Sequence, residues 1–134
     1  NYTGSCLCGQ ATFEIEGEFD RFFLCHCERC RKDTGSAHAA NLFSSAAKLK
    51  WLSGEENVRT FHCGNDGHIK SFCRTCGSAM PNMQAGGTLL VVPAGCIDED
   101  EQMRPQGHLY CANRAGWDDG FEDVPRFEEL PPMG

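Results

Sequence analysis

Seven of the ten cysteines in this 134-residue chain fall into three short motifs. They are a CxC, a CxCxxC and a CxxC, formed in turn by Cys6 and Cys8, by Cys25, Cys27 and Cys30, and by Cys73 and Cys76. Thiolates at such short spacing are typical ligands of tetrahedral zinc. A disulfide framework explains them less well, because cysteines one residue apart rarely meet disulfide geometry. Inert buried thiols would be scattered over apolar faces. The motifs therefore predict metal binding.

The cysteine count divides most simply into a site of four and a site of three. Two cysteines cannot hold zinc alone, so the CxC and the CxxC combine into one four-thiolate site. A glycine follows both Cys8 and Cys76, and its conformational freedom would let each loop curl around the metal. The spacing also permits the CxC to pair with the first two cysteines of the CxCxxC, and this alternative stays open.

The CxCxxC motif would then hold a metal with three thiolates. Structural zinc has four protein ligands, whereas catalytic zinc keeps one position for water or substrate. The count alone is consistent with an open site and with a site closed by a further side chain. By residue type, the candidates for a fourth ligand are Cys63, Cys96, Cys111, His38, His62 and His108. His26, between two cysteines of the motif, is a weaker candidate.

The acidic charge is concentrated in the C-terminal part of the chain. There are 19 Asp and Glu against 12 Lys and Arg, which gives a net charge of −7. Residues 1–97 hold equal numbers of acidic and basic side chains, so the excess lies in residues 98–134. We interpret the acidic runs there, such as residues 98–101, mainly as solvated surface. The charge balance argues against a nucleic-acid partner.

The sequence predicts neither a membrane span nor a secretory signal. The longest apolar stretch, residues 89–97, has nine residues and is broken by Pro93 and Gly95. No basic segment followed by an apolar one opens the chain. We therefore expect no membrane partner and a cytoplasmic location. The length fits a single domain over residues 1–134, with an acidic C-terminal segment at 98–134.

The elements that must position the cysteine loops are mainly short strands. Apolar and polar residues alternate over residues 11–16, which predicts a half-buried strand directly after the CxC. Further strands, separated by Gly, Ser and Asn, are predicted at residues 21–24, 37–43, 48–52, 58–62, 68–72, 89–92 and 108–112. Only residues 28–33 and 44–47 suggest helical turns. The predicted fold class is mainly β, with antiparallel sheets that carry zinc-binding knuckles on their loops.

Three segments together resemble the glutathione-dependent formaldehyde-activating enzyme family. They are residues 4–9 (GSCLCG), 25–32 (CHCERCRK) and 72–78 (FCRTCGS). The resemblance extends to about residue 132 through residues 51–54, residues 108–110, Trp117, Asp118, Phe127, Pro131 and Pro132. This family, which has relatives of the centromere protein V type, implies a β-tent fold with two zinc ions per chain. The resemblance assigns a structural zinc to Cys6, Cys8, Cys73 and Cys76, and a catalytic zinc to Cys25, Cys27 and Cys30.

The same resemblance implies a zinc-dependent carbon–sulfur lyase. Its partners would be glutathione or a similar small thiol and an aldehyde such as formaldehyde, joined in S-hydroxymethylglutathione. Side chains of a type that could bind the carboxylates of glutathione are Arg29, Arg31, Lys32, Arg74 and Arg114, each otherwise expected at the solvated surface. The alternative hypothesis is a non-catalytic binding module stabilised by zinc, because a fold does not fix a function. Cys63, Cys96 and Cys111 lie outside the family's zinc pattern.

Overall fold

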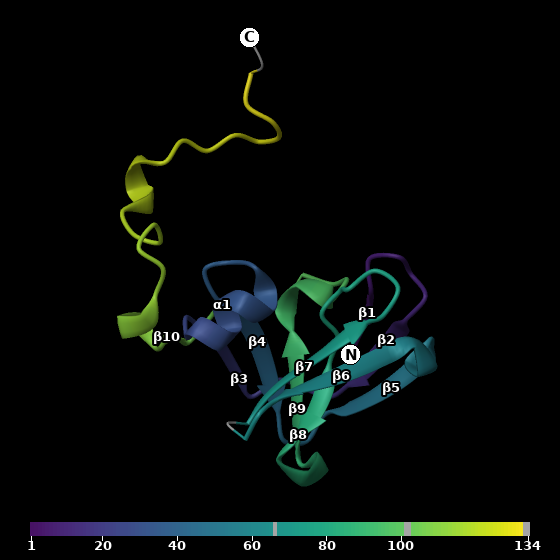
Figure 1. Ribbon diagram of the computed structural model, residues 1–134. Helices are drawn as coiled ribbons and strands as arrows, with labels where there is room; N and C mark the ends of the chain where they lie inside the picture. Colours follow the sequence, from purple (N-terminus) through teal and green to yellow (C-terminus); the bar gives the residue numbers. More distant parts are fainter. Residues whose placement is uncertain (66, 101–102, 133–134) are drawn as a thin grey trace.

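The computed structural model describes residues 1–65, 67–100 and 103–132, and these residues form a mainly β fold, as the sequence predicts (Figure 1). Their strands are β1 (Tyr2–Ser5), β2 (Thr12–Glu16), β3 (Arg21–Cys25), β4 (Ala39–Ser44), β5 (Lys48–Ser53), β6 (Val58–Cys63), β7 (His68–Cys73), β8 (Asn82–Gln84), β9 (Leu89–Pro93) and β10 (Gly107–Leu109). Their helices are α1 (Glu28–Thr34) and the short 3-10 turns η1 (Glu55–Asn57), η2 (Ala85–Gly87), η3 (Ala94–Cys96), η4 (Cys111–Asn113) and η5 (Phe121–Asp123).

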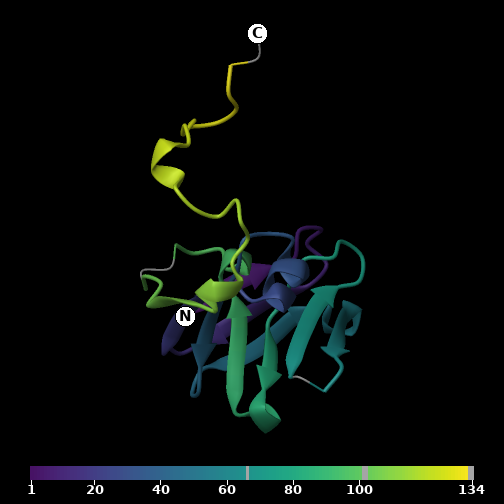
Figure 2. The ribbon, with the colours of Figure 1, turned by 60° about the vertical axis from the view of Figure 1, so that its left-hand side comes forward.

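The described strands form three sheets. One has the order β1-β2-β5, the second has the order β10-β3-β4-β9-β8, and β6 and β7 form a separate hairpin. The pairing is antiparallel throughout these sheets except between β10 and β3, which run parallel. Figures 1 and 2 show the β6–β7 hairpin beside β8 and β9. A pocket lies between the hairpin and the five-stranded sheet.

Alternating side chains of the strands build the core. Phe13 and Ile15, two residues apart in β2, are almost completely buried, as are Leu42 of β4 and Leu90 of β9. Burying a side chain of this size contributes about 1.5–3 kcal/mol. Two of the clustered cysteines, Cys6 and Cys73, belong to this same core cluster. The loops that carry cysteines are therefore anchored directly to the packed interior.

Helix α1 begins inside the CxCxxC motif. Cys27 is its N-cap residue, and its sulfur accepts a hydrogen bond from the backbone N–H of Cys30 at 3.4 Å. The helix ends at Gly35, whose φ of 65° is left-handed and suits glycine. The helical turn predicted at residues 28–33 is thus confirmed. Cys30 and Asp33 lie three residues apart, so they share one side of the helix.

Some local predictions are wrong or incomplete. Residues 44–47 do not form a helical turn, because the hydroxyl of Ser44 donates to the carbonyl of Glu18 at 2.8 Å and accepts the N–H of Ala47 at 2.9 Å. This side chain competes with the backbone bonds that a helix would need. Strands β1 and β8 are short and were not predicted; they form against β2 and β9. The last strand ends at Leu109, where Tyr110 takes a left-handed φ of 57°.

The acidic part of the chain is not only solvated surface. Thr3 donates its backbone N–H to Glu99 Oε1 at 2.8 Å and its hydroxyl to Asp98 Oδ2 at 3.0 Å. The predicted acidic run also includes Glu101, which lies outside the described residues. Beyond β10 the chain extends away from the sheets as an arm, residues 110–132 (Figures 1 and 2). Within the described residues, no helix has the length and apolar character to cross a membrane.

Candidate metal centres and the adjoining pocket

The first cysteine cluster unites the CxC and the CxxC motifs. Cys6, Cys8, Cys73 and Cys76 bring their sulfur atoms within 4.8 Å of one another. The sulfur–sulfur distance is 3.6 Å from Cys6 to Cys8 and 3.8 Å from Cys8 to Cys73. Tetrahedral zinc with bonds of about 2.3 Å to sulfur separates its ligands by about 3.8 Å. The donor set therefore fits zinc, and the alternative pairing of the CxC with the CxCxxC motif is not the one that forms.

Two glycines shape the loops around this cluster. Gly9 and Gly77, which follow cysteines of the two motifs, have φ values of 81° and 77°. In these left-handed turns Gly9 N donates to Cys6 O at 3.1 Å and Gly77 N donates to Cys73 O at 2.7 Å. The two knuckles share a left-handed glycine, although the hydrogen bond spans three residues in the first and four in the second. Side chains other than glycine rarely adopt this backbone conformation, so both positions favour glycine.

Polar groups around the first cluster are directed at its sulfur atoms. The buried side chain of Asn57 donates to Cys73 Sγ at 3.3 Å, while its Oδ1 accepts from Arg74 Nε at 2.7 Å. Hydrogen bonds from the hydroxyl and the backbone of Ser78 lower the pKa of Cys76 to about 5. A metal needs deprotonated thiols, so these groups favour the form of the site that binds zinc.

The second cluster consists of Cys25 at the end of β3, Cys27 at the cap of α1 and Cys30 inside α1. Their three sulfur atoms also lie within 4.8 Å of one another. Burial acts to raise the pKa of Cys27, but hydrogen bonds from Cys30 and Cys25 outweigh it and bring this pKa below its usual value. Burial raises the pKa of Cys30. Three thiols of one loop, one of them set to ionise readily, are a donor set that suits zinc.

In the described part of the chain, no further Cys, His, Asp or Glu side chain joins the three-cysteine cluster at the same spacing. The six side chains proposed as a fourth ligand therefore lie outside it. The sulfur of Cys96 donates to Pro93 O at 3.0 Å, and burial raises the pKa of Cys96 to about 12. The sulfur of Cys111 lies 3.7 Å from His108 O. Cys63 ends β6, in the separate hairpin.

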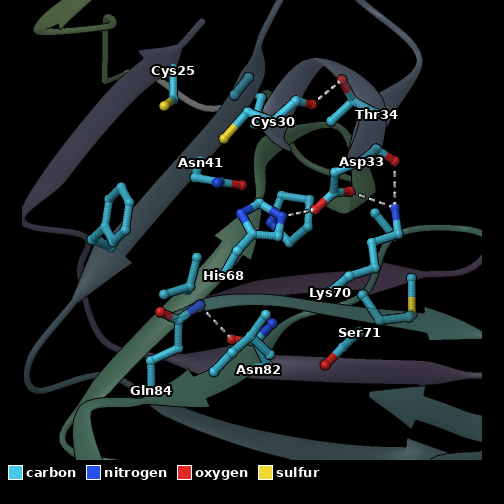
Figure 3. A pocket seen from close by; sticks show the side chains of 18 of the residues that line it. Cys25, Cys30, Asp33, Thr34, Asn41, His68, Lys70, Ser71, Asn82 and Gln84 are labelled. Carbon is cyan, nitrogen blue, oxygen red and sulfur yellow. Dashed lines mark hydrogen bonds and ion pairs between the residues drawn. The ribbon is translucent and has the colours of Figure 1, made fainter. Parts of the chain in front are cut away.

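A pocket of about 230 Å³ adjoins the three-cysteine cluster. Cys25 and Cys30 form part of its wall, and Cys27 does not. Apolar side chains such as Phe43 and Val91 line it together with polar ones, of which Figure 3 labels several. The polar residues include Asn41, Ser71, Asn82 and Gln84. The pocket thus places two of the three thiols beside a small chamber with hydrogen-bonding groups.

The most polar part of the pocket wall is a cluster of three side chains. Asp33 of α1 lies between His68 and Lys70 of β7 (Figure 3). Its Oδ2 is 2.7 Å from His68 Nε2, and its Oδ1 is 2.7 Å from Lys70 Nζ. The side chains of Asp33 and His68 are only 15% and 20% exposed. Each oxygen of the carboxylate therefore has its own partner, and the orientation of the pair is fixed.

The sequence alone does not single out these three residues. Their signals were present but weak: Asp33 follows Cys30 by one helical turn, and His68 and Lys70 alternate in a strand and so share a face. The basic residues that the sequence singled out are placed differently. Lys32 lies 3.5 Å from Glu28 on the exposed side of α1. Arg29 and Lys32 also line a second hollow, of about 570 Å³, which shares Asp33, His68 and Lys70 with the pocket.

Three other histidines, His26, His38 and His108, lie next to one another. His26 Nε2 lies 2.8 Å from His108 Nδ1, and the rings of His26 and His38 are 5.1 Å apart. His26 Nδ1 lies 3.0 Å from Asp118 Oδ2 without the alignment of a hydrogen bond, and the contact is an ion pair when His26 is protonated. His26 is therefore engaged with β10 and the arm, not with the cysteines' metal position.

Two cysteine clusters that could hold metal ions, carried by loops of a mainly β fold, define the class of this protein. The chain belongs to the family described as glutathione-dependent formaldehyde-activating enzyme, which it matches over residues 1–113. This confirms the resemblance seen in the sequence and supports a role related to glutathione and aldehydes. A crystal structure of a Rhodobacter sphaeroides protein is similar in fold, with a TM-score of 0.59 and 24% sequence identity, and the match covers 79% of this chain and 98% of that chain.

Proposed function

We propose that the protein is a zinc-dependent carbon–sulfur lyase that forms or cleaves the adduct of a small thiol and an aldehyde. The observation that carries the proposal is the position of Cys25 and Cys30 in the wall of a small pocket. The family's description supports glutathione as the thiol and formaldehyde as the aldehyde. In this proposal Cys25, Cys27 and Cys30 hold the catalytic zinc, and the four-cysteine cluster holds a structural one.

The pocket suits the reacting ends of such substrates. Zinc held by the three cysteines would supply a position where a substrate thiol binds and loses its proton. Apolar side chains such as Phe43, Met80 and Val91 line the pocket, while the amides of Asn41 and Asn82 offer donors to a carbonyl oxygen. In the forward direction the sulfur–carbon bond forms, the carbonyl π bond breaks, and the thiol proton ends on oxygen.

The second hollow suits the rest of a thiol as large as glutathione. The pocket of about 230 Å³ is too small for a whole tripeptide, which needs a site of several hundred Å³. The adjoining hollow has about 570 Å³ and is lined by the apolar side chains of Phe61 and Phe72 and by the cations of Arg29 and Lys32. Glutathione has two carboxylates, and such cations would attract them.

The proposal also includes a cellular compartment and an alternative without catalysis. We place the protein in the cytoplasm, because the ten cysteines are all free and thiolate sites persist in a reducing compartment. Glutathione is abundant in such a compartment. The alternative, a non-catalytic module stabilised by zinc, predicts the same metal content without any chemistry at the three-cysteine cluster. The experiment below separates the two.

The test is the rate at which the zinc-loaded protein exchanges ¹³C-formaldehyde between solution and its glutathione adduct, measured by NMR exchange spectroscopy at equilibrium. We expect faster exchange than in buffer alone, and a loss of the acceleration in Cys30→Ser. Cys111→Ser, which changes an exposed cysteine outside both clusters, is the matched control and should keep it. Exchange no faster than in buffer, with two zinc ions bound, would contradict the lyase proposal and favour the binding module.

A further inference from the structure

The Asp33–His68 pair has a geometry that points to a role in proton transfer. We propose that His68, oriented by Asp33, is the catalytic acid and base of the pocket beside the three-cysteine cluster. This inference rests on the proposed thiol–aldehyde chemistry, because that chemistry requires a proton to leave a sulfur atom and reach an oxygen atom. An imidazole is the side chain best suited to accept and return a proton near neutral pH.

His68 is singled out from the other histidines by its position. The chain contains five histidines, and among them His68 alone lines the pocket. His26 and His108 bond to each other behind the metal loop, and the ring of His38 packs against His26. His62 lines a different hollow, and because it pairs with Ile69 in the β6–β7 register, it points to the opposite face of the hairpin from His68. Among the histidines, His68 is therefore the one placed to accept a proton from a reaction in the pocket.

The contacts of Asp33 hold the imidazole in one orientation. Asp33 Oδ2 lies 2.7 Å from His68 Nε2, so this nitrogen carries the hydrogen and donates it to the carboxylate. The other ring nitrogen, Nδ1, is then the one that accepts a proton, and Figure 3 shows it on the side of the ring that faces Asn41. Lys70 Nζ lies 2.7 Å from Asp33 Oδ1 and donates to the Asp33 carbonyl oxygen at 3.0 Å. Lys70 thereby keeps the carboxylate from turning.

The charged and titratable groups around His68 come from four elements. Helix α1 contributes Asp33 and Cys30, and also Arg29 and Lys32 from the second hollow. Cys25 lies on β3, Lys70 on β7 itself, and Cys63 on β6, where it is the register partner of His68. The positive charge of Lys70 and the negative charge of Asp33 offset each other next to the ring. His68 thus lines the same pocket as the thiols of Cys25 and Cys30, and the charge of its acidic partner is offset by Lys70.

The proposed step balances without a further reactant. In the forward direction His68 Nδ1 accepts the proton of the substrate thiol, and the sulfur attacks the aldehyde carbon. The sulfur–carbon bond forms, the carbonyl π electrons move to oxygen, and His68 returns the proton to that oxygen. In cleavage the same nitrogen takes the hydroxyl proton and delivers it to the departing sulfur. No redox change occurs in either direction.

The test compares His68→Gln with His62→Gln in the zinc-loaded protein. Acid–base catalysis contributes about 10²- to 10⁴-fold, so His68→Gln should lower kcat at least about 100-fold with little change in KM. His62→Gln alters a histidine of the same hairpin outside the pocket and should keep kcat. For His68→Ala, added imidazole should restore part of the rate, because a free base can occupy the vacated space. Asp33→Asn should lower kcat as well, and Asp33→Glu less.

A second readout separates this inference from the proposed function. Zinc content and glutathione binding, followed by the absorption of cobalt in place of zinc, should be unchanged in His68→Gln. If wild-type protein is active and His68→Gln retains its kcat, the inference on His68 is wrong and the lyase proposal stands. If His68→Gln loses activity together with zinc or glutathione binding, its role is structural, and the inference is again wrong. If wild-type protein shows no activity at all, the proposed function itself fails, and the inference with it.

Discussion

His26 and Asp118 connect the metal loop with the C-terminal arm. His26 lies between two cysteines of the three-cysteine cluster, and its Nδ1 is 3.0 Å from Asp118 Oδ2. The two side chains are only 4% and 13% exposed, and the opposite ring nitrogen of His26 contacts His108 at 2.8 Å. One imidazole thus contacts both β10 and the arm. The loop that carries Cys25, Cys27 and Cys30 is therefore held against β10 and the base of the arm.

Removing this contact should loosen the base of the arm without loss of metal. We expect Asp118→Ala to increase proteolysis and hydrogen exchange in residues 110–132, because the arm loses its contact with the buried His26. Asp119→Ala is the matched control, since the side chain of Asp119 is 76% exposed. Equal protection of the arm in both variants and in the wild type would show that the contact does not hold it.

The two cysteine clusters should differ in their importance for folding. The four-cysteine cluster joins the CxC loop to the far end of β7 and includes residues of the core, so Cys76→Ser should give unfolded or aggregated protein. Structural zinc binding is worth about 10 kcal/mol or more. Cys30→Ser changes a cluster within a single loop and should leave most of the thermal stability. Equal loss of melting temperature in both variants would contradict this division of roles.

Asn57 should govern the zinc affinity of the four-cysteine cluster. Its amide nitrogen contacts Cys73 Sγ at 3.3 Å and also donates to Thr75 Oγ1 at 2.9 Å. Loss of such a partner of a ligand typically weakens metal binding about 10- to 100-fold. We expect Asn57→Ala to do so in competition with a chelator, whereas Arg59→Ala, at an exposed position of the same segment, should not. Wild-type affinity in Asn57→Ala would show that the amide is dispensable.

His38 should make stability depend on pH. Burial, followed by the charges of His26 and His108, lowers the pKa of His38 below 6.5. Its Nδ1 is buried, and within the described structure it has no hydrogen-bond partner. The unfolded chain therefore binds the proton at higher pH than the folded one does, so stability is fully present above about pH 6.5 and falls as the pH drops through the lowered pKa.

The measurement for His38 is an NMR titration of its ring protons in the zinc-loaded protein. We expect a midpoint below that of a histidine in an unfolded peptide. In His38→Gln, the loss of unfolding free energy between pH 7 and pH 5.5 should be smaller than in the wild type. A midpoint at or above the peptide value would mean that burial does not control this group.

The sequence was most informative where chemistry and local spacing coincide. The three cysteine motifs predict both clusters, because the ligands of each motif are close together in the chain and the CxC and CxxC are each followed by a glycine, Gly9 and Gly77. Most strands were also predicted, because alternation such as that of Phe13 and Ile15 reflects burial directly. Helix α1 could be predicted from its short polar segment, although not that Cys27 would cap it.

The pocket could not be predicted in the same way. Asp33 and His68 are 35 residues apart, and their contact depends on how the β6–β7 hairpin packs beside α1. No local pattern encodes that packing. The parallel pairing of β10 with β3 has a similar cause, because it depends on the long segment that returns the chain to the edge of the sheet. At residues 44–47 the local sequence suggests a helical turn that does not form, because the hydroxyl of Ser44 makes hydrogen bonds that compete with those of a helix.

The central claim is that a substrate thiol binds at the three-cysteine cluster. Its most direct test is the absorption spectrum of protein that holds cobalt in place of zinc, since thiolate-to-cobalt bands report each sulfur ligand. We predict that glutathione increases these bands, that S-methylglutathione, which has no thiol, does not, and that Cys30→Ser abolishes the difference. The four-cysteine cluster contributes a constant background. An unchanged spectrum in excess glutathione would contradict the claim.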